Sequence, residues 1–124
     1  MRREALLLAA ALGCAPAWAA QAEDAAAGAA AFRTFCGACH SVARGGRHMQ
    51  GPSLHGVTGR KAGTAPGYRY SAALKAFGKT WTPEMLDAYL AEPKRLVPQG
   101  SMNVRGISDA RRRREIVAFL TEQR

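Results

Sequence analysis

Two cysteines and a histidine lie close together in the segment FCGACHS, which covers residues 35–41. Cys36 and Cys39 are separated by two residues, and His40 directly follows the second cysteine. Thiol pairs at this spacing form redox-active disulfides in some proteins and half of a zinc site in others, and they attach haem when a histidine follows. The rest of the chain must decide among these three chemistries.

The redox dithiol and the zinc site both need partners that the sequence lacks. Redox-active pairs of the thioredoxin kind belong to a strand–helix–strand unit, but no segment before the motif alternates as a strand. Structural zinc sites take four ligands, and only His48 and His55 remain, without a second cysteine pair. We therefore predict one covalently attached c-type haem, held by Cys36 and Cys39, with His40 as an iron ligand.

The opposite face of the haem iron needs a second strong ligand if the protein carries electrons. Residues 48 and 49 follow His40 too closely to reach that face, and Met85 belongs to the apolar face of an expected helix. Met102 lies in the loop VPQGSMNVRG, far enough along the chain to come round. We predict Met102 as the second ligand. The candidates considered are Met49, Met85, Met102, His48 and His55.

The elements around the motif are predicted to be helices joined by long loops. The first helix should cover Glu23–Phe35, with acidic residues in its first turn, and run straight into the motif. The long stretch 41–70 shows little periodicity, and a loop of that length in a small domain is best explained by a ligand that it wraps around. The fold class predicted is all-α, a single domain wrapped around the haem. The other expected helices are 72–77 after a Ser71 cap, 83–92 after a Thr82 cap, and one after a Ser108 cap, with a loop over 93–107.

The amino terminus has the pattern of an export signal. Two early arginines precede the apolar run ALLLAAAL, which is too short to span a bilayer, and the small residues APAWAA follow. Cleavage after Ala19 or Ala20 would fit this pattern. We predict a signal peptide over 1–20 and a mature domain over 21–124 in the periplasm. The sequence ALGC at Cys14 also resembles a lipoprotein cleavage site, so a lipid anchor there is the alternative.

The formal net charge is +9 at pH 7, which points to acidic partner surfaces. The run of four arginines at 111–114 invites a nucleic-acid interpretation. It lies in an expected helix, where the side chains would fan around the axis, and the chain is expected to be exported. We therefore expect no nucleic-acid partner and interpret the run as helix surface. The residues expected around an exposed haem edge are Lys61, Lys75, Lys79, Lys94 and Arg95.

Taken together, the motifs resemble one known family over most of the chain, from Asp24 to Gln123. They are CGACH, GPSLHGVTGRKAG, APGYRYS, YLAEPKR, VPQGSM and IVAFL. The chain is similar to class I c-type cytochromes, both mitochondrial-type cytochrome c and the short bacterial cytochromes c2. The interval from His40 to Met102 matches that family without insertion or deletion.

The resemblance implies roles for residues outside the motif. The Pro52 carbonyl would accept a hydrogen bond from the His40 ring, and the Tyr89 hydroxyl would reach the Met102 sulfur. The residues implied around a haem propionate are Arg60, Tyr70 and Trp81. The implied helix contact joins Gly28 and Phe32 to Ile116, Phe119 and Leu120. The chain departs from the mitochondrial pattern at Leu74, Gly100, Ser101 and Val104.

By this resemblance the protein is expected to be a monomeric electron carrier and not an enzyme. It would take single electrons from a bc1-type complex or a dehydrogenase and pass them to a terminal oxidase or a reaction centre. It would do so as a mature chain without a transmembrane span. The alternative functions are the haem subunit of a periplasmic oxidoreductase, and a gas-binding or peroxidatic haem protein.

Overall fold

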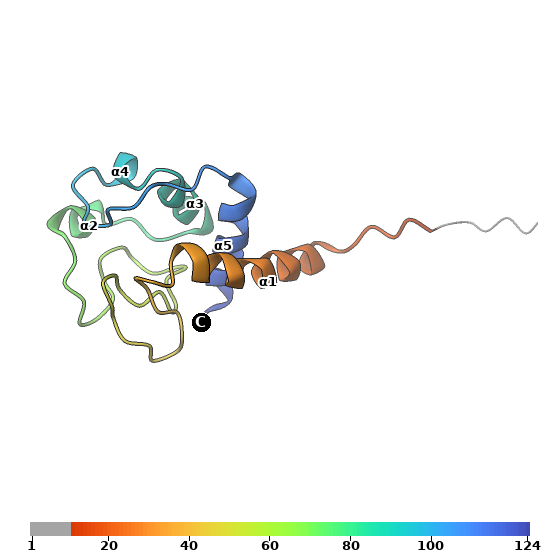
Figure 1. The fold of residues 1–124 in the computed structure, drawn as a ribbon, viewed down its shortest axis with the longest axis horizontal. Helices are drawn as coiled ribbons and strands as arrows, with labels where there is room; N and C mark the ends of the chain where they lie inside the picture. Colours follow the sequence, from red (N-terminus) through yellow and green to blue (C-terminus); the bar gives the residue numbers. More distant parts are fainter. Residues whose placement is uncertain (1–10) are drawn as a thin grey trace, which may run out of the picture.

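The computed structural model describes residues 11–124, and its helices are joined by long irregular segments (Figure 1). Within that range there is no strand, only an isolated antiparallel bridge between Lys61 and Thr80. The all-α prediction is thus confirmed. None of the helices in this range is long and apolar enough to cross a membrane. The helices are α1 (Ala17–Phe35), α2 (Ala72–Phe77), α3 (Pro83–Ala91), α4 (Pro93–Leu96) and α5 (Ala110–Glu122).

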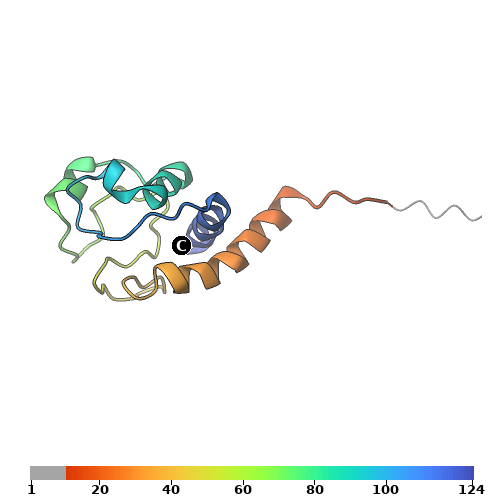
Figure 2. The same cartoon turned by 45° about the horizontal axis from the view of Figure 1, so that its top comes forward.

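The core forms where α1 crosses α5 (Figures 1 and 2). The rings of Phe32 and Phe119 lie 5.5 Å apart between centroids, and Ile116 is fully buried beside them. The two backbones approach so closely that a Cβ on Gly28 would overlap the carbonyl oxygen of Glu115. A glycine is therefore needed at this crossing, and the packing implied by the resemblance is present.

The first helix begins earlier than predicted, at Ala17 rather than at Glu23. The intervening residues AWAAQA are mostly strong helix formers with no breaker after Pro16, so the helix continues back to that proline. The acidic residues consequently lie beyond the first turn, which contradicts the sequence prediction. The early turns of α1 project from the body of the protein (Figure 2). Trp18 in these turns is exposed.

The predicted boundary of the signal peptide falls inside α1. Residues 1–10, which hold the early arginines and most of the apolar run, lie outside the described residues. The signal peptide over 1–20 therefore stays a prediction.

Two predicted helix caps are present, at the starts of α2 and α3. The Ser71 hydroxyl accepts a hydrogen bond from the Leu74 amide at 3.1 Å, and the Thr82 hydroxyl accepts one from the Met85 amide at 3.1 Å. Pro83 occupies the first helical turn, where its missing N–H has no intrahelical partner to lose. Gly78 ends α2 in the left-handed conformation.

The carboxyl-terminal third of the chain differs from prediction in two places. The cap of α5 is Asp109 and not Ser108, since the Asp109 carboxylate accepts hydrogen bonds from the Arg111 and Arg112 amides at 2.9 and 3.3 Å. A carboxylate caps a helix as well as a hydroxyl does and also interacts favourably with the helix dipole. The loop predicted over 93–107 begins with the short helix α4, which Pro93 starts.

The long segment 41–70 contains no helix, but it is ordered by contacts with distant parts of the chain. The Gly59 amide donates to the Trp81 carbonyl at 2.8 Å, and the Trp81 amide donates to the Arg60 carbonyl at 2.9 Å. The Ala62 amide reaches the Lys79 carbonyl at 2.8 Å. These bonds fasten the segment to the residues just before α3, and the two together form one wall of a cavity.

Candidate functional site

A cavity of about 250 Å³ lies between the end of α1, the segment 41–70, helix α3 and the segment 97–109. Its walls are largely apolar, with Leu54, Val57 and Leu86 among them. Every residue that the sequence predicted as part of the site lines this one cavity, although the residues come from four separate regions of the chain. They are Cys36, Cys39, His40, Pro52, Arg60, Tyr70, Trp81, Tyr89 and Met102.

The two cysteines of the motif lie in a tight turn directly after α1. The Cys39 and His40 amides both donate to the Cys36 carbonyl, at 3.1 and 2.9 Å. Both thiols are free rather than joined in a disulfide. Burial, and then the neighbouring Cys39, raise the pKa of Cys36 to about 11. A redox dithiol needs a lowered thiol pKa, so the raised pKa of Cys36 argues against that chemistry.

The His40 ring is fixed by two neighbours in the segment GPSL. Its Nδ1 lies 2.7 Å from the Pro52 carbonyl oxygen, so Nδ1 carries the proton and donates to that oxygen. The other nitrogen, Nε2, is then the one that can bind a metal. Burial lowers the pKa of His40, although the bond to Pro52 opposes this. The imidazole is consequently neutral at pH 7, as a metal ligand must be.

Gly51 is a site residue that the sequence analysis did not single out. A Cβ at this position would overlap the His40 ring, because the ring packs directly on the Gly51 backbone. The Gly51 amide also donates to the Cys39 carbonyl at 2.8 Å, which closes the turn around the motif. The signal in the sequence was the glycine immediately before Pro52.

Of the candidates for a second ligand, Met102 alone lines the cavity in the part of the chain that the structure describes. Met85 packs against the hydrophobic core, as predicted, and Met49 is exposed. The His55 ring is bound through Nδ1 to the Val42 carbonyl at 3.1 Å, outside the cavity lining.

His48 has both ring nitrogens engaged and is not available as a ligand. The Ser53 amide donates to its Nδ1 at 2.9 Å, which leaves the ring proton on Nε2. That nitrogen donates to the Pro66 carbonyl at 2.7 Å. His48 is therefore a cross-link within the segment 41–70.

The three residues that the resemblance implies around a propionate, Arg60, Tyr70 and Trp81, all line the cavity. The Arg60 guanidinium donates to the carbonyl oxygens of His55 and Ser53 at 3.1 and 3.2 Å. It has five N–H donors in all, so others are left for an anionic group. The Tyr70 hydroxyl accepts from the Ala65 amide at 3.1 Å and keeps its own proton to donate.

Tyr89 and Trp81 form the aromatic part of the wall near α3, with ring centroids 4.9 Å apart. Burial raises the pKa of the Tyr89 hydroxyl. Within residues 11–124 this hydroxyl makes no hydrogen bond to protein, although Tyr89 and Met102 line the same cavity. The bond from Tyr89 to the Met102 sulfur stays a prediction.

The donor set fits a covalently attached haem better than a metal ion alone. No group of three or more His, Cys, Asp or Glu side chains that could hold a metal occurs in the described range. A metal here would need most of its ligands from a macrocycle, and the two free thiols beside His40 can anchor one. The apolar walls suit its flat faces. The four departures from the mitochondrial pattern also line the cavity; they are Leu74, Gly100, Ser101 and Val104.

Comparison with known proteins gives one consistent result. A family model described as Cytochrome c matches residues 25–123. Cytochrome c of Cannabis sativa is 41% identical over 99 residues, which cover 80% of this chain and 89% of the relative. Cytochrome c of Sesamum indicum is 42% identical over 91 residues, covering 73% of this chain and 82% of the relative. Cytochrome c2 of Rhodopila globiformis is 43% identical over 89 residues, covering 72% and 83%.

Proposed function

The chain belongs to the cytochrome c family, and from that premise we propose a periplasmic one-electron carrier whose haem iron is bound by His40 and Met102. Membership makes the protein an electron carrier with a covalently attached haem c, and not an enzyme. The ligands, the location and the partners are the proposed parts. The observation that supports the ligands is the lining of the cavity. Among the described residues, Met102 is the one candidate for the second ligand that lines it.

Each residue of the site has a separate task in this proposal. Cys36 and Cys39 hold the haem by thioether bonds, and the Pro52 carbonyl keeps Nε2 of His40 free of a proton. When bound, the haem supplies reversible one-electron chemistry at its iron, and a methionine ligand raises the reduction potential. Arg60 and Tyr70 provide N–H and O–H donors to the propionate, which would otherwise be a costly buried charge.

The partners are proposed to be redox proteins with acidic docking surfaces. These would be a bc1-type complex or a dehydrogenase as donor, and a terminal oxidase or a reaction centre as acceptor. The side chains that support this are all exposed, although Arg95 is paired with Glu92 at 3.2 Å and so contributes less net charge. They are Lys61, Lys75, Lys79, Lys94 and Arg95.

The periplasmic location depends on the amino terminus. We propose that residues 1–20 direct export and are then removed, which leaves a domain with a net charge of +8. Mass spectrometry of the purified protein tests this directly. A mass that begins at residue 20 or 21 with one haem added is expected. A mass that begins at an acylated Cys14 would show a lipid anchor instead, and an uncleaved chain would contradict export by this signal.

The ligand proposal is tested by the charge-transfer band that marks methionine–iron ligation in oxidised c-type cytochromes, at the red end of the visible spectrum. The wild-type protein should show this band and Met102→Ala should lack it. Met85→Leu is the matched control, because it alters a methionine that packs against the core and lies outside the cavity. Survival of the band in Met102→Ala would overturn the assignment.

A further inference from the structure

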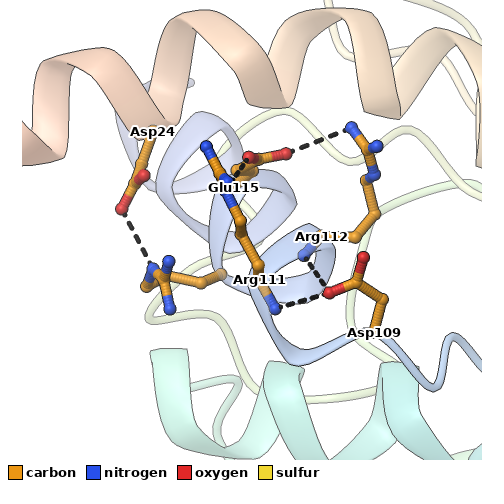
Figure 3. Close-up of polar contacts among 6 residues, drawn as sticks. Asp24, Asp109, Arg111, Arg112 and Glu115 are labelled. Carbon is orange, nitrogen blue, oxygen red and sulfur yellow. Dashed lines mark hydrogen bonds and ion pairs between the residues drawn. The ribbon is translucent and has the colours of Figure 1, made fainter.

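The four consecutive arginines of α5 have different surroundings. Arg111 and Arg112 both pair with Glu115, and Arg114 pairs with Asp24 of α1, at 3.2 Å in each case (Figure 3). Their side chains are 78%, 43% and 60% exposed. The Arg113 side chain is only 14% exposed. The prediction that the run is helix surface is therefore wrong for Arg113, which is covered by other parts of the chain.

The Arg113 guanidinium joins three separate elements. Its Nε donates to the Asp87 carboxylate of α3 at 2.8 Å. Its Nη1 donates to the backbone carbonyl oxygens of Ile107 and Ser108 at 2.7 and 3.0 Å. One side chain of α5 thus binds both α3 and the end of the segment that carries Met102.

The middle of that segment has little support from hydrogen bonds. Residues 101–106 make no backbone hydrogen bond within the described range. At the near end, the Gly100 amide donates to the Val97 carbonyl at 3.0 Å, and the Lys94 ammonium bonds the Gly100 carbonyl. At the far end, the Ile107 amide donates to the Leu90 carbonyl at 2.8 Å. The Arg113 side chain adds the bonds to the Ile107 and Ser108 carbonyls, so it is a second contact that holds the far end.

We propose that Arg113, oriented by Asp87, is a positioning residue for the methionine ligand. This rests on the proposed function, because it takes Met102 as the ligand. A thioether is a neutral and comparatively weak ligand, so its occupancy depends on how much freedom its loop must lose on binding. Fixing both ends of a segment lowers that entropic cost. Helix α3 also forms a wall of the cavity through Leu86 and Tyr89. The bond from Arg113 to Asp87 therefore holds the segment of Met102 in a fixed position relative to that wall.

The test measures how easily an added ligand displaces Met102. The oxidised holoprotein is titrated with imidazole, which competes for the iron, and loss of the charge-transfer band is followed. Arg113→Gln should bind imidazole about tenfold more tightly than the wild type, equivalent to ~1.4 kcal/mol. Arg114→Gln is the matched control, since it removes the same charge and one inter-helix pair without touching 97–109. It should bind imidazole like the wild type.

Two milder variants keep the test decisive if Arg113→Gln fails to fold around haem. Asp87→Asn retains a hydrogen-bond acceptor for Nε but loses the charge, and Arg113→Lys retains the charge but cannot bond both partners at once. Each should bind imidazole about threefold more tightly than the wild type, because each variant weakens the charge-assisted bond without removing it.

The outcomes separate this inference from the proposed function. If the wild type lacks the band, or if Met102→Ala keeps it, the ligand assignment fails. If the band behaves as expected but the Arg113 and Asp87 variants bind imidazole no more tightly than Arg114→Gln, Arg113 has only a structural role and the inference is overturned. Arg113 is 14% exposed and Arg114 60%, so Arg113→Gln also loses more general stability than its control does. Urea denaturation of each holoprotein measures that loss. Tighter imidazole binding where every variant is fully folded supports positioning.

Discussion

The two sides of the cavity are built in different ways. On the His40 side, backbone and ring bonds follow one another closely, from Gly51 to Cys39, from His40 to Pro52 and from Ser53 to His48. On the Met102 side, the residues between Gly100 and Ile107 make no backbone hydrogen bonds to the described chain, and Val104 is 49% exposed.

The difference indicates which ligand is the weaker point of the site. The histidine is held in one tautomer and one orientation by its immediate neighbours. Little conformational entropy is therefore lost when its ring binds the iron. The methionine depends on anchors at the two ends of its segment. Perturbations near His40 should therefore disturb folding around the haem, whereas perturbations near Met102 should open the site while the fold survives.

The largest effect is expected from Gly51→Ala. The added methyl group would overlap the His40 ring, and neither partner can move, because the ring is bonded to Pro52 and Gly51 is bonded to Cys39. We expect the free energy of unfolding of the holoprotein to fall by about 3 kcal/mol, measured by urea denaturation. A loss below about 1 kcal/mol would mean that the His40 side is not rigid.

Gly106→Ala is the counterpart on the Met102 side. A Cβ there would overlap the Ala91 carbonyl oxygen, so the clash is at least as severe. The preceding residues can shift to relieve it, since they lack backbone hydrogen bonds. Urea denaturation should show a smaller loss, about 1–2 kcal/mol. Imidazole affinity should rise more than in Gly51→Ala, and the reverse order would contradict the comparison of the two sides.

The smallest effect is expected from Tyr89→Phe and appears only at high pH. Burial raises the pKa of Tyr89 in the folded protein above its ordinary value of 10.0. The neutral hydroxyl therefore contributes stability below pH 10, and that contribution is lost as the pH rises through the folded pKa, because the unfolded state ionises first. Urea midpoints from pH 8 to 11 should fall less steeply for Tyr89→Phe than for the wild type. Equal slopes would contradict the burial of this hydroxyl.

Much of the fold and site could be predicted because the signals are local. The motif places two thiols and a ring within five residues, and the caps at Ser71 and Thr82 act on amides three residues away. The position of Met102 followed from the length of chain that separates it from His40.

The parts that were missed depend on choices or contacts that a local pattern does not contain. Ser108 and Asp109 are both good cap residues, so only the folded structure shows which one begins α5. Between Pro16 and Glu23 no residue breaks a helix, so the sequence does not mark where α1 begins. The Arg113–Asp87 pair joins residues that are 26 positions apart, and neither helical periodicity nor composition predicts it.

The central proposal is a haem iron closed on both faces by His40 and Met102. Mixing the reduced protein with carbon monoxide at neutral pH tests it most directly, because carbon monoxide binds reduced iron only where a face is open. The wild type should bind it slowly or not at all, and Met102→Ala should bind it rapidly. Rapid binding by the wild type would contradict the closed site and favour a gas-binding protein instead.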